Sequence, residues 1–207
     1  MKLETPRLPD TLTEHFELPD EDEFEGCLFD GIDAPHEMLR GREFRGCVFR
    51  RCTLTDADLT HAGFVDVRFD HCDLSRARME RAVFQRVVFD TCRLSGADMP
   101  RAILRNTVLQ ECRADYLNLS EAKLEHGAFT ACRMPEAALE SMVHKDWAFA
   151  DCDLTRATVF RTPMKGVDLT TCTLDGLLVG LNDLRGMIVT AAQAAELSKL
   201  LGLVVKA

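Results

Sequence analysis

Apolar residues recur at every fifth position over most of this chain, from Phe24 to Val189. All but three of these positions carry a large apolar side chain, and the exceptions are Ala34, Ala114 and His144. A second residue, small or apolar and often Ala or Cys, lies two positions earlier in most quintets, with Glu37 and Arg42 as interruptions near the start. The other three positions of each quintet are mostly polar or Gly.

This period of five excludes the ordinary secondary structures. An amphipathic helix places apolar residues about every 3.6 positions, and a half-buried strand places them every 2.0. Two apolar positions per quintet instead fit a chain that makes a short extended step, turns and repeats. The pattern therefore predicts a solenoid in which two side chains per step point to a common axis.

The cysteines give the length of one circuit. They stand at spacings that are multiples of five, and at spacings of twenty from Cys52 onward: Cys27, Cys47, Cys52, Cys72, Cys92, Cys112, Cys132, Cys152 and Cys172. One coil therefore contains four quintets, and coils that pair like parallel strands rise about 4.8 Å each, which predicts a rod of roughly 40 Å. We interpret the cysteines as small apolar side chains that point into the core. A zinc site needs four ligands that surround one ion, and thiols stacked in a straight column do not provide that geometry. Free thiols favour a reducing compartment, so we expect a cytoplasmic protein without metal or cofactor.

Several quintets are similar to one known motif. Ala57–His61 reads Ala-Asp-Leu-Thr-His, Cys72–Arg76 reads Cys-Asp-Leu-Ser-Arg, and Cys152–Arg156 reads Cys-Asp-Leu-Thr-Arg. These segments resemble the pentapeptide-repeat family. The resemblance implies an all-β fold, a right-handed quadrilateral parallel β-helix with four five-residue faces per coil.

The two ends of the chain depart from the repeat. We expect residues 1–22 to form an acidic leader that covers the first coil with Leu12, Phe16 and Leu18, since exposed strand edges invite aggregation. Residues 23–189 form the predicted β-helix. Residues 190–207 are predicted to form a short capping and dimerisation helix, with a capping box at Thr190 and Gln193.

The segment 180–205 resembles the C-terminus of the Qnr-type and MfpA-type branch of the family. That resemblance implies a head-to-head homodimer through the C-terminal helix, with these interface candidates: Leu197, Leu200, Leu201 and Leu203. It further implies a DNA-mimic-like rod that binds DNA gyrase or topoisomerase IV and gives resistance to quinolones or other gyrase poisons. The alternative is a cytoplasmic scaffold for an unrelated partner, which an outward apolar cluster would suit: Val83, Val88, Ile103, Val108 and Val143.

The charge is distributed unevenly along the chain. The net charge is −9, and residues 1–40 account for all of it, with twelve Asp or Glu against three Lys or Arg. Direct binding of nucleic acid is disfavoured, because it needs a net positive footprint. A candidate partner-facing acidic surface maps to one corner and the adjoining face: Asp56, Asp58, Asp98, Asp115, Glu136 and Glu140. Arginines share this surface, and a solvated face without function is an equally good interpretation.

The sequence does not predict an enzyme or a membrane protein. No paired carboxylates, catalytic triad or phosphate-binding loop interrupt the repeat. A single histidine in an apolar row, His144, is more often a satisfied core residue than a catalytic one. No apolar run is long enough to cross a bilayer, and the first residues lack the apolar core of a signal peptide.

Overall fold

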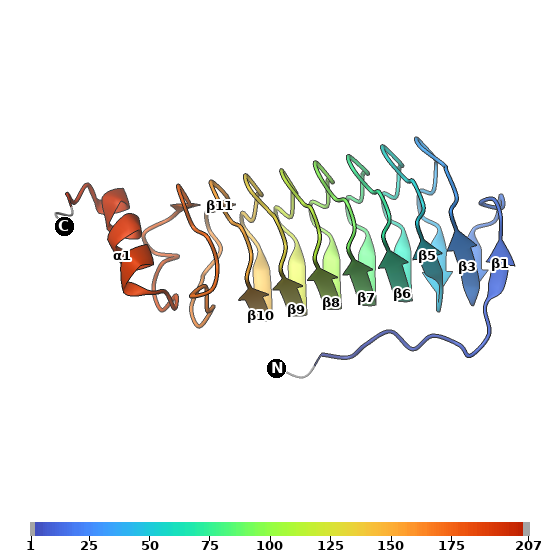
Figure 1. Cartoon of the computed structure of the whole chain (residues 1–207), viewed down its shortest axis with the longest axis horizontal. Helices are drawn as coiled ribbons and strands as arrows, with labels where there is room; N and C mark the ends of the chain where they lie inside the picture. Colours follow the sequence, from blue (N-terminus) through green and yellow to red (C-terminus); the bar gives the residue numbers. More distant parts are fainter. Residues whose placement is uncertain (1–2, 205–207) are drawn as a thin grey trace.

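The computed structural model describes residues 3–204 as one rod of stacked coils with a helix at its C-terminal end (Figure 1). The strands and helices, in chain order, are β1 (Thr13–His15), β2 (Glu23–Glu25), β3 (Cys27–Asp30), β4 (Glu43–Arg45), β5 (Val48–Arg50), β6 (Gly63–Asp70), β7 (Val83–Asp90), β8 (Ile103–Gln110), β9 (Lys123–Thr130), β10 (Val143–Ala150), β11 (Thr158–Val159), β12 (Leu178–Val179), α1 (Ala191–Ser198) and the 3₁₀ helix η1 (Lys199–Leu201). The expected β-helix with a short C-terminal helix is confirmed.

Successive coils pair in parallel with a register of twenty residues. Phe64 on β6 pairs with Phe84 on β7, and Leu104 on β8 pairs with Leu124 on β9. Each coil has four faces, which we number 1 to 4 and which are centred in the first coil on Phe24, Phe29, Ala34 and Leu39. Strands β6 to β10 span faces 1 and 2. Faces 3 and 4 are joined mostly by single bridges such as Asp73↔Arg93 and Arg78↔Asp98, and β11 and β12 pair on face 4. Residues separated by multiples of twenty form a column.

The corners explain why the repeat is five residues long. Every fifth residue from Gly26 to Gly166 has a φ between +51° and +80°, in the left-handed region. This conformation turns the chain at the end of each step, and it favours glycine because a Cβ meets the following carbonyl there. Most corners nevertheless hold other residues, including Ala131, Thr91 and many arginines and aspartates.

The interior is filled by like residues stacked on like. Phe24, Phe44, Phe64 and Phe84 stack with ring centroids 4.9 to 5.2 Å apart, and the neighbouring column from Phe29 to Phe89 stacks at 4.7 to 4.9 Å. Rings of the two columns meet edge to face, an arrangement that the ring quadrupole favours. Leu117 fills the space beside Ala114 while Tyr116 points outward, as its position in the quintet predicts.

The strand ladder ends after β10 because the next coil begins with a proline. In the preceding coil the Val143 N–H donates to Ala122 O, but Pro163 stands in the same column and has no N–H to give. The buried Thr162 hydroxyl completes the hydrogen bonds here: it donates to Leu139 O at 2.8 Å and accepts from Met142 N–H at 3.0 Å. Pairing resumes in the last coil, as Asp168↔Ile188 shows, so no residue has been inserted.

The leader closes the first coil and then runs along the outside of the rod. β1 pairs with β3, which places His15 on the ring of Phe29 at 5.4 Å, and Leu18 packs against the core. Phe16 does not contribute to this cover, since 84% of it is exposed. Residues before β1 extend back beside the strands towards the middle of the rod (Figure 1).

Candidate functional site

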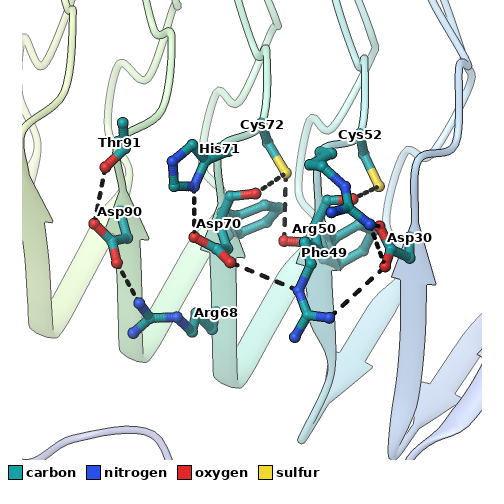
Figure 2. Close-up of polar contacts among 12 residues, drawn as sticks. Asp30, Phe49, Arg50, Cys52, Arg68, Asp70, His71, Cys72, Asp90 and Thr91 are labelled. Atoms are coloured by element: carbon teal, nitrogen blue, oxygen red, sulfur yellow. Dashed lines mark hydrogen bonds and ion pairs between the residues drawn. The ribbon is translucent and has the colours of Figure 1, made fainter.

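The cysteine side chains form part of the packed core and hydrogen-bond to the backbone. All nine thiols are free and buried. Figure 2 shows two of them: Cys52 donates to Phe29 O at 3.2 Å, and Cys72 donates to Phe49 O at 3.3 Å. Burial raises the pKa of the Cys47 thiol to about 12, so the nucleophilic thiolate is disfavoured. Within residues 3–204 no three His, Cys, Asp or Glu side chains converge as metal ligands would.

His144 is a displaced core residue. It stands in the column of Phe84, Leu104 and Leu124, but its ring turns so that Nε2 lies 2.6 Å from Pro163 O. Its ring centroid is 5.0 Å from that of Trp147. The displacement leaves a groove of about 230 Å³ on face 1, lined by Ile103, Arg105, Lys123, Leu124, Glu125, Val143, His144 and Lys145.

On faces 3 and 4, the six acidic candidates lie where the sequence predicts, but each has a polar partner one coil away. Asp56 accepts two hydrogen bonds from Arg76 at 2.6 and 2.8 Å. Asp58, which is 4% exposed, accepts from Arg78 at 2.6 Å.

The remaining four candidates follow the same rule. Asp98 accepts from the Asn118 amide at 2.7 Å, and Asp115 pairs with Arg133 at 3.0 Å. Glu136 pairs with Arg156, and Glu140 lies 3.9 Å from Arg161.

These partners change the acidity of the carboxyl groups. The hydrogen bonds from Arg76 hold the pKa of Asp56 below its ordinary value. Burial by itself raises the pKa of Asp58, but the hydrogen bonds from Thr60 and the charge of Arg78 outweigh it and leave the pKa lowered. Both groups therefore remain ionised but neutralised, so this surface presents alternating charge and little net field.

Face 2 carries the same kind of ladder (Figure 2). Arg50 lies 3.7 Å from Asp30 and 3.6 Å from Asp70, between its two neighbours along the axis. Arg68 continues the series by pairing with Asp90. Opposite charges in adjacent coils stabilise parallel pairing and leave this face close to neutral.

The C-terminal end is held by Gln193. The expected capping box is present: Gln193 N–H donates to Thr190 Oγ1 at 3.2 Å, and Thr190 N–H donates to Gln193 Oε1 at 2.8 Å. The Gln193 side-chain amide also donates to Leu169 O at 2.8 Å and Cys172 O at 2.7 Å. The helix thus satisfies carbonyl groups that the last coil leaves open.

The four leucines proposed for the dimer interface differ in exposure. Leu197 is 9% exposed and packs on the core, whereas Leu201 and Leu203 are 57% and 55% exposed. Leu200 lies between these values at 39%. Apolar residues of the last coil flank the helix on two sides, since Leu178 lines a hollow with Leu200, and Leu184 and Met187 line another with Leu201. Leu181, Ile188 and Val204 are also exposed at this end. An exposed apolar surface of this kind is typical of an interface.

The leader lies along the corner between faces 1 and 2. Arg7 N–H donates to Asp66 Oδ1 at 2.9 Å, and Glu4 N–H donates to Asn106 Oδ1 at 3.2 Å. Pro9 lies above Gly46, where an added Cβ would come within 3.2 Å of the proline ring. This path is not visible in the hydrophobic pattern, because its contacts are polar and involve single residues. The charge ladders could have been predicted from the sequence, because residues of opposite charge occur twenty positions apart, as Asp66 and Arg86 do.

Comparison with protein families gives two matches. The model described as "Pentapeptide repeat region" matches residues 82–159, and the model described as "Pentapeptide repeats (8 copies)" matches residues 39–65 and 64–99. Together they cover residues 39–159, which is more than half of the chain. No curated protein matches it. No helix among residues 3–204 has the length and apolar character needed to traverse a bilayer.

Several solved structures are similar to the chain at low identity. A trypsin-treated variant of QnrB1, a plasmid-mediated fluoroquinolone resistance protein, is 20% identical over 95% of this chain and 99% of its own, with a TM-score of 0.40. HetL, a pentapeptide repeat protein involved in heterocyst differentiation regulation from the cyanobacterium Nostoc sp. strain PCC 7120, is 13% identical over 82% of this chain and 89% of its own, with a TM-score of 0.32. Rfr23, a pentapeptide repeat protein from the cyanobacterium Cyanothece 51142, is 17% identical over 82% of this chain and 92% of its own, with a TM-score of 0.17.

Proposed function

This chain belongs to the pentapeptide-repeat proteins, and we propose that it is a non-enzymatic, DNA-mimic-like rod that binds a type II topoisomerase. The partner is DNA gyrase or topoisomerase IV, and the effect is protection from quinolones or other gyrase poisons. The observation that carries this proposal is the C-terminal end, where the tail similar to the Qnr-type and MfpA-type branch forms a pinned helix with exposed leucines.

The distribution of charge indicates which part of the rod acts as the mimic. The six acidic candidates on faces 3 and 4 have polar partners, whereas residues 10–25 hold eight Asp or Glu and no Lys or Arg. In a head-to-head dimer these acidic ends would lie at the two far tips of a double-length rod. We therefore place the contact with the basic DNA-binding saddle of the enzyme at the tips, with the neutral coils between them as a spacer.

The dimer has a direct test at its exposed leucines. Leu201→Asp with Leu203→Asp is expected to give a monomer by light scattering, because two charges would have to be buried in the interface. Phe16→Asp is the matched control, since Phe16 is exposed at the opposite end of the rod. An unchanged mass for the double variant contradicts the C-terminal interface.

The function is tested by supercoiling and cleavage assays with purified gyrase, with and without ciprofloxacin. We expect fewer drug-stabilised cleavage complexes when the protein is present, and less protection by the variant with Leu201→Asp and Leu203→Asp. If the protein neither inhibits gyrase nor protects it from the drug, the proposal is contradicted.

The second candidate is a scaffold for an unrelated partner. It is favoured by the neutral ladders on faces 2 to 4 and by the outward apolar cluster, in which Val143 is 66% exposed although Val88 is only 8% exposed. An intact, dimeric protein without effect on gyrase or topoisomerase IV would support it.

A further inference from the structure

Face 1 differs from the other faces in that many of its charged side chains have no partner. The rod has three lysines, Lys123, Lys145 and Lys165, and all three lie on face 1. Among residues 3–204 none of them has a carboxylate within 4.0 Å, and the same face holds further charged residues without an ion pair, including Glu23, Glu25, Glu43 and Arg45. Charges that are left unpaired within one molecule are available to a partner.

These charges are ordered along the axis. The first two coils of face 1 are mainly acidic and present Glu23, Glu25 and Glu43 together with Arg45. The outward side chains of face 1 form two columns, which start at Glu23 and Glu25. In the next coils these two columns are uncharged, since Gly63 and Val65 are followed by Val83 and Gln85. The later coils are mainly basic and contain the groove beside His144, with these basic residues: Arg105, Lys123, Lys145 and Lys165. Glu125 is the acidic residue among them and lies 3.7 Å from Arg105 of the preceding coil.

We infer that face 1 is a self-complementary docking surface whose occupant is face 1 of a second, antiparallel copy of this chain. The two copies are related by a two-fold axis that runs along the strand direction and passes through Val83 and Gln85. Each residue of one copy then faces a residue of the same column in the other copy, on the opposite side of the axis and the same number of coils away from it. The registers then place Glu43 opposite Lys123, Glu25 opposite Lys145 and Arg45 opposite Glu125.

The symmetry makes each of these three pairs occur twice. The two strand columns that would meet contain no like-charge pair. Val83 meets its own copy at the centre, Gly63 meets Ile103, and the exposed Val143 lies opposite Glu23. Apolar contact at the centre and opposite charges at both ends are the arrangement that favours one orientation and register over others.

The neighbouring leader borders this surface but leaves it open. Its polar contacts are with the corner residues Asp66, Arg86 and Asn106, and Pro9 packs over the corner glycines Gly26 and Gly46. Between the leader and the adjacent column of face 1 lies a hollow lined by Glu25, Arg45 and Val65. Side chains of the proposed pairs are exposed at both ends of the face: Glu25 at the acidic end, and Lys123 and Lys145 at the basic end. Glu43 is half-buried, because its carboxylate lies over Gly63, where an added Cβ would come within 2.3 Å of Oε2.

The size of the surface predicts a weak complex. Seven strands spaced about 4.8 Å apart and four residues wide, at about 3.3 Å per residue, present roughly 400 Å² per copy. Burial of roughly 800 Å² in total is at the low end for protein interfaces, so we expect a transient, salt-sensitive dimer. This interface is separate from the proposed C-terminal one.

Charge reversal tests the inference, with sedimentation velocity as the measurement. The parent protein carries Leu201→Asp and Leu203→Asp, so that the C-terminal contact does not contribute whether or not it exists. A variant with a more acidic face is made with Lys123→Glu and Lys145→Glu, and one with a more basic face with Glu25→Lys and Glu43→Lys. Circular dichroism and thermal melting first establish that each variant is folded.

We expect the parent to self-associate at high concentration and low salt, and each variant alone to associate at least about tenfold more weakly, because like charges now meet. An equimolar mixture of the two variants is expected to form the heterodimer. Arg40→Glu with Arg113→Glu is the matched control for the acidic variant: it lowers the net charge as much as Lys123→Glu with Lys145→Glu does, at exposed positions of faces 4 and 3, and should retain the parent behaviour.

Three results would overturn the inference. The first is a parent that remains monomeric throughout the concentration series at low salt. The second is a face-1 variant that associates as well as the parent, and the third is a control that loses association to the same extent. None of these results bears on binding to a topoisomerase, which is measured separately.

Discussion

In the first four coils phenylalanine rings stack on one another in two neighbouring columns, whereas the coil after β10 holds Met164 and Leu169 in the same columns. The strands differ in the same way, since β6 to β10 are continuous and the coil that begins at Pro163 has none on faces 1 and 2. Both regions keep the same repeat and the same register of twenty. Stacked rings and a complete ladder thus make the first region self-sufficient, while the second depends on Thr162 and on the helix held by Gln193.

The largest expected effect that separates the two regions comes from Phe64→Ala. Phe64 is 1% exposed and stacks between Phe44 and Phe84 at 5.1 and 5.2 Å, so its loss removes contacts on both sides. We expect the free energy of unfolding to fall by about 3–5 kcal/mol in denaturant titration. Leu154→Ala, in an equally buried position of the later coils, should cost less, and the opposite order would contradict the role given to the ring stack.

A smaller effect is expected at the hydroxyl that replaces the strand ladder. Thr162→Val keeps the shape of the side chain but leaves Leu139 O and Met142 N–H without their partner. The expected loss is about 1–3 kcal/mol in the same titration. Thr162→Ser keeps the hydroxyl and serves as the control, so an equal loss for both variants would show that the methyl group matters instead.

A corner substitution should act in the opposite direction. The first coils already have glycine at left-handed corners such as Gly26 and Gly46, whereas Ala131 holds φ +51° in the later part of the rod. Ala131→Gly removes the steric cost of this conformation, but glycine also increases the conformational entropy of the unfolded chain, which offsets part of the benefit. We expect the free energy of unfolding to rise by about 0.5–1 kcal/mol. Ala138→Gly, at an outward position without positive φ, should give no gain, and equal gains at both sites would refute this explanation.

The smallest effect concerns pH and the ladders. Partial burial alone raises the pKa of Asp66, but the hydrogen bonds from Arg86 and the Arg7 N–H lower it below its ordinary value. A carboxyl group with a lowered pKa stabilises the fold above its unfolded pKa, near 3.9, and this contribution is lost as the pH falls through the folded pKa. Thermal unfolding between pH 5 and pH 2.5 should show this loss, and Asp66→Asn should reduce it. An unchanged pH dependence in the variant would argue against the contribution of Asp66.

The interior of this protein could be predicted from its sequence, because every inward position repeats the same apolar requirement. Phe64, Cys72 and Leu74 are buried where the period of five places them. His144 and Pro163 mark the place where the strand ladder of faces 1 and 2 stops after β10. The sequence identified the histidine but not the effect of the proline. The reason is that a missing N–H leaves no trace in a hydrophobic pattern.

The surface could be predicted only in part. Residue number modulo twenty assigned Asp56 and Asp58 to their faces, but not the hydrogen bonds that neutralise them. Those bonds depend on which rotamer each arginine adopts, and Arg76 and Arg78 could equally have pointed to solvent. The path of the leader was also beyond prediction, since it depends on two backbone donors, of Arg7 and Glu4, meeting side chains far away in sequence.

The one-face-per-quintet construction has a consequence for how such proteins change during evolution. Deleting or duplicating five residues keeps every later apolar side chain directed inward, but it rotates all later coils by a quarter turn relative to the earlier ones. Such an event would move the lysines of face 1 onto an adjacent side and bring phenylalanine columns over smaller residues. A change of twenty residues lengthens or shortens the rod while leaving each side chemically aligned. The number of coils can therefore change without altering the binding surfaces, whereas the insertion or deletion of a single quintet rearranges them in one step.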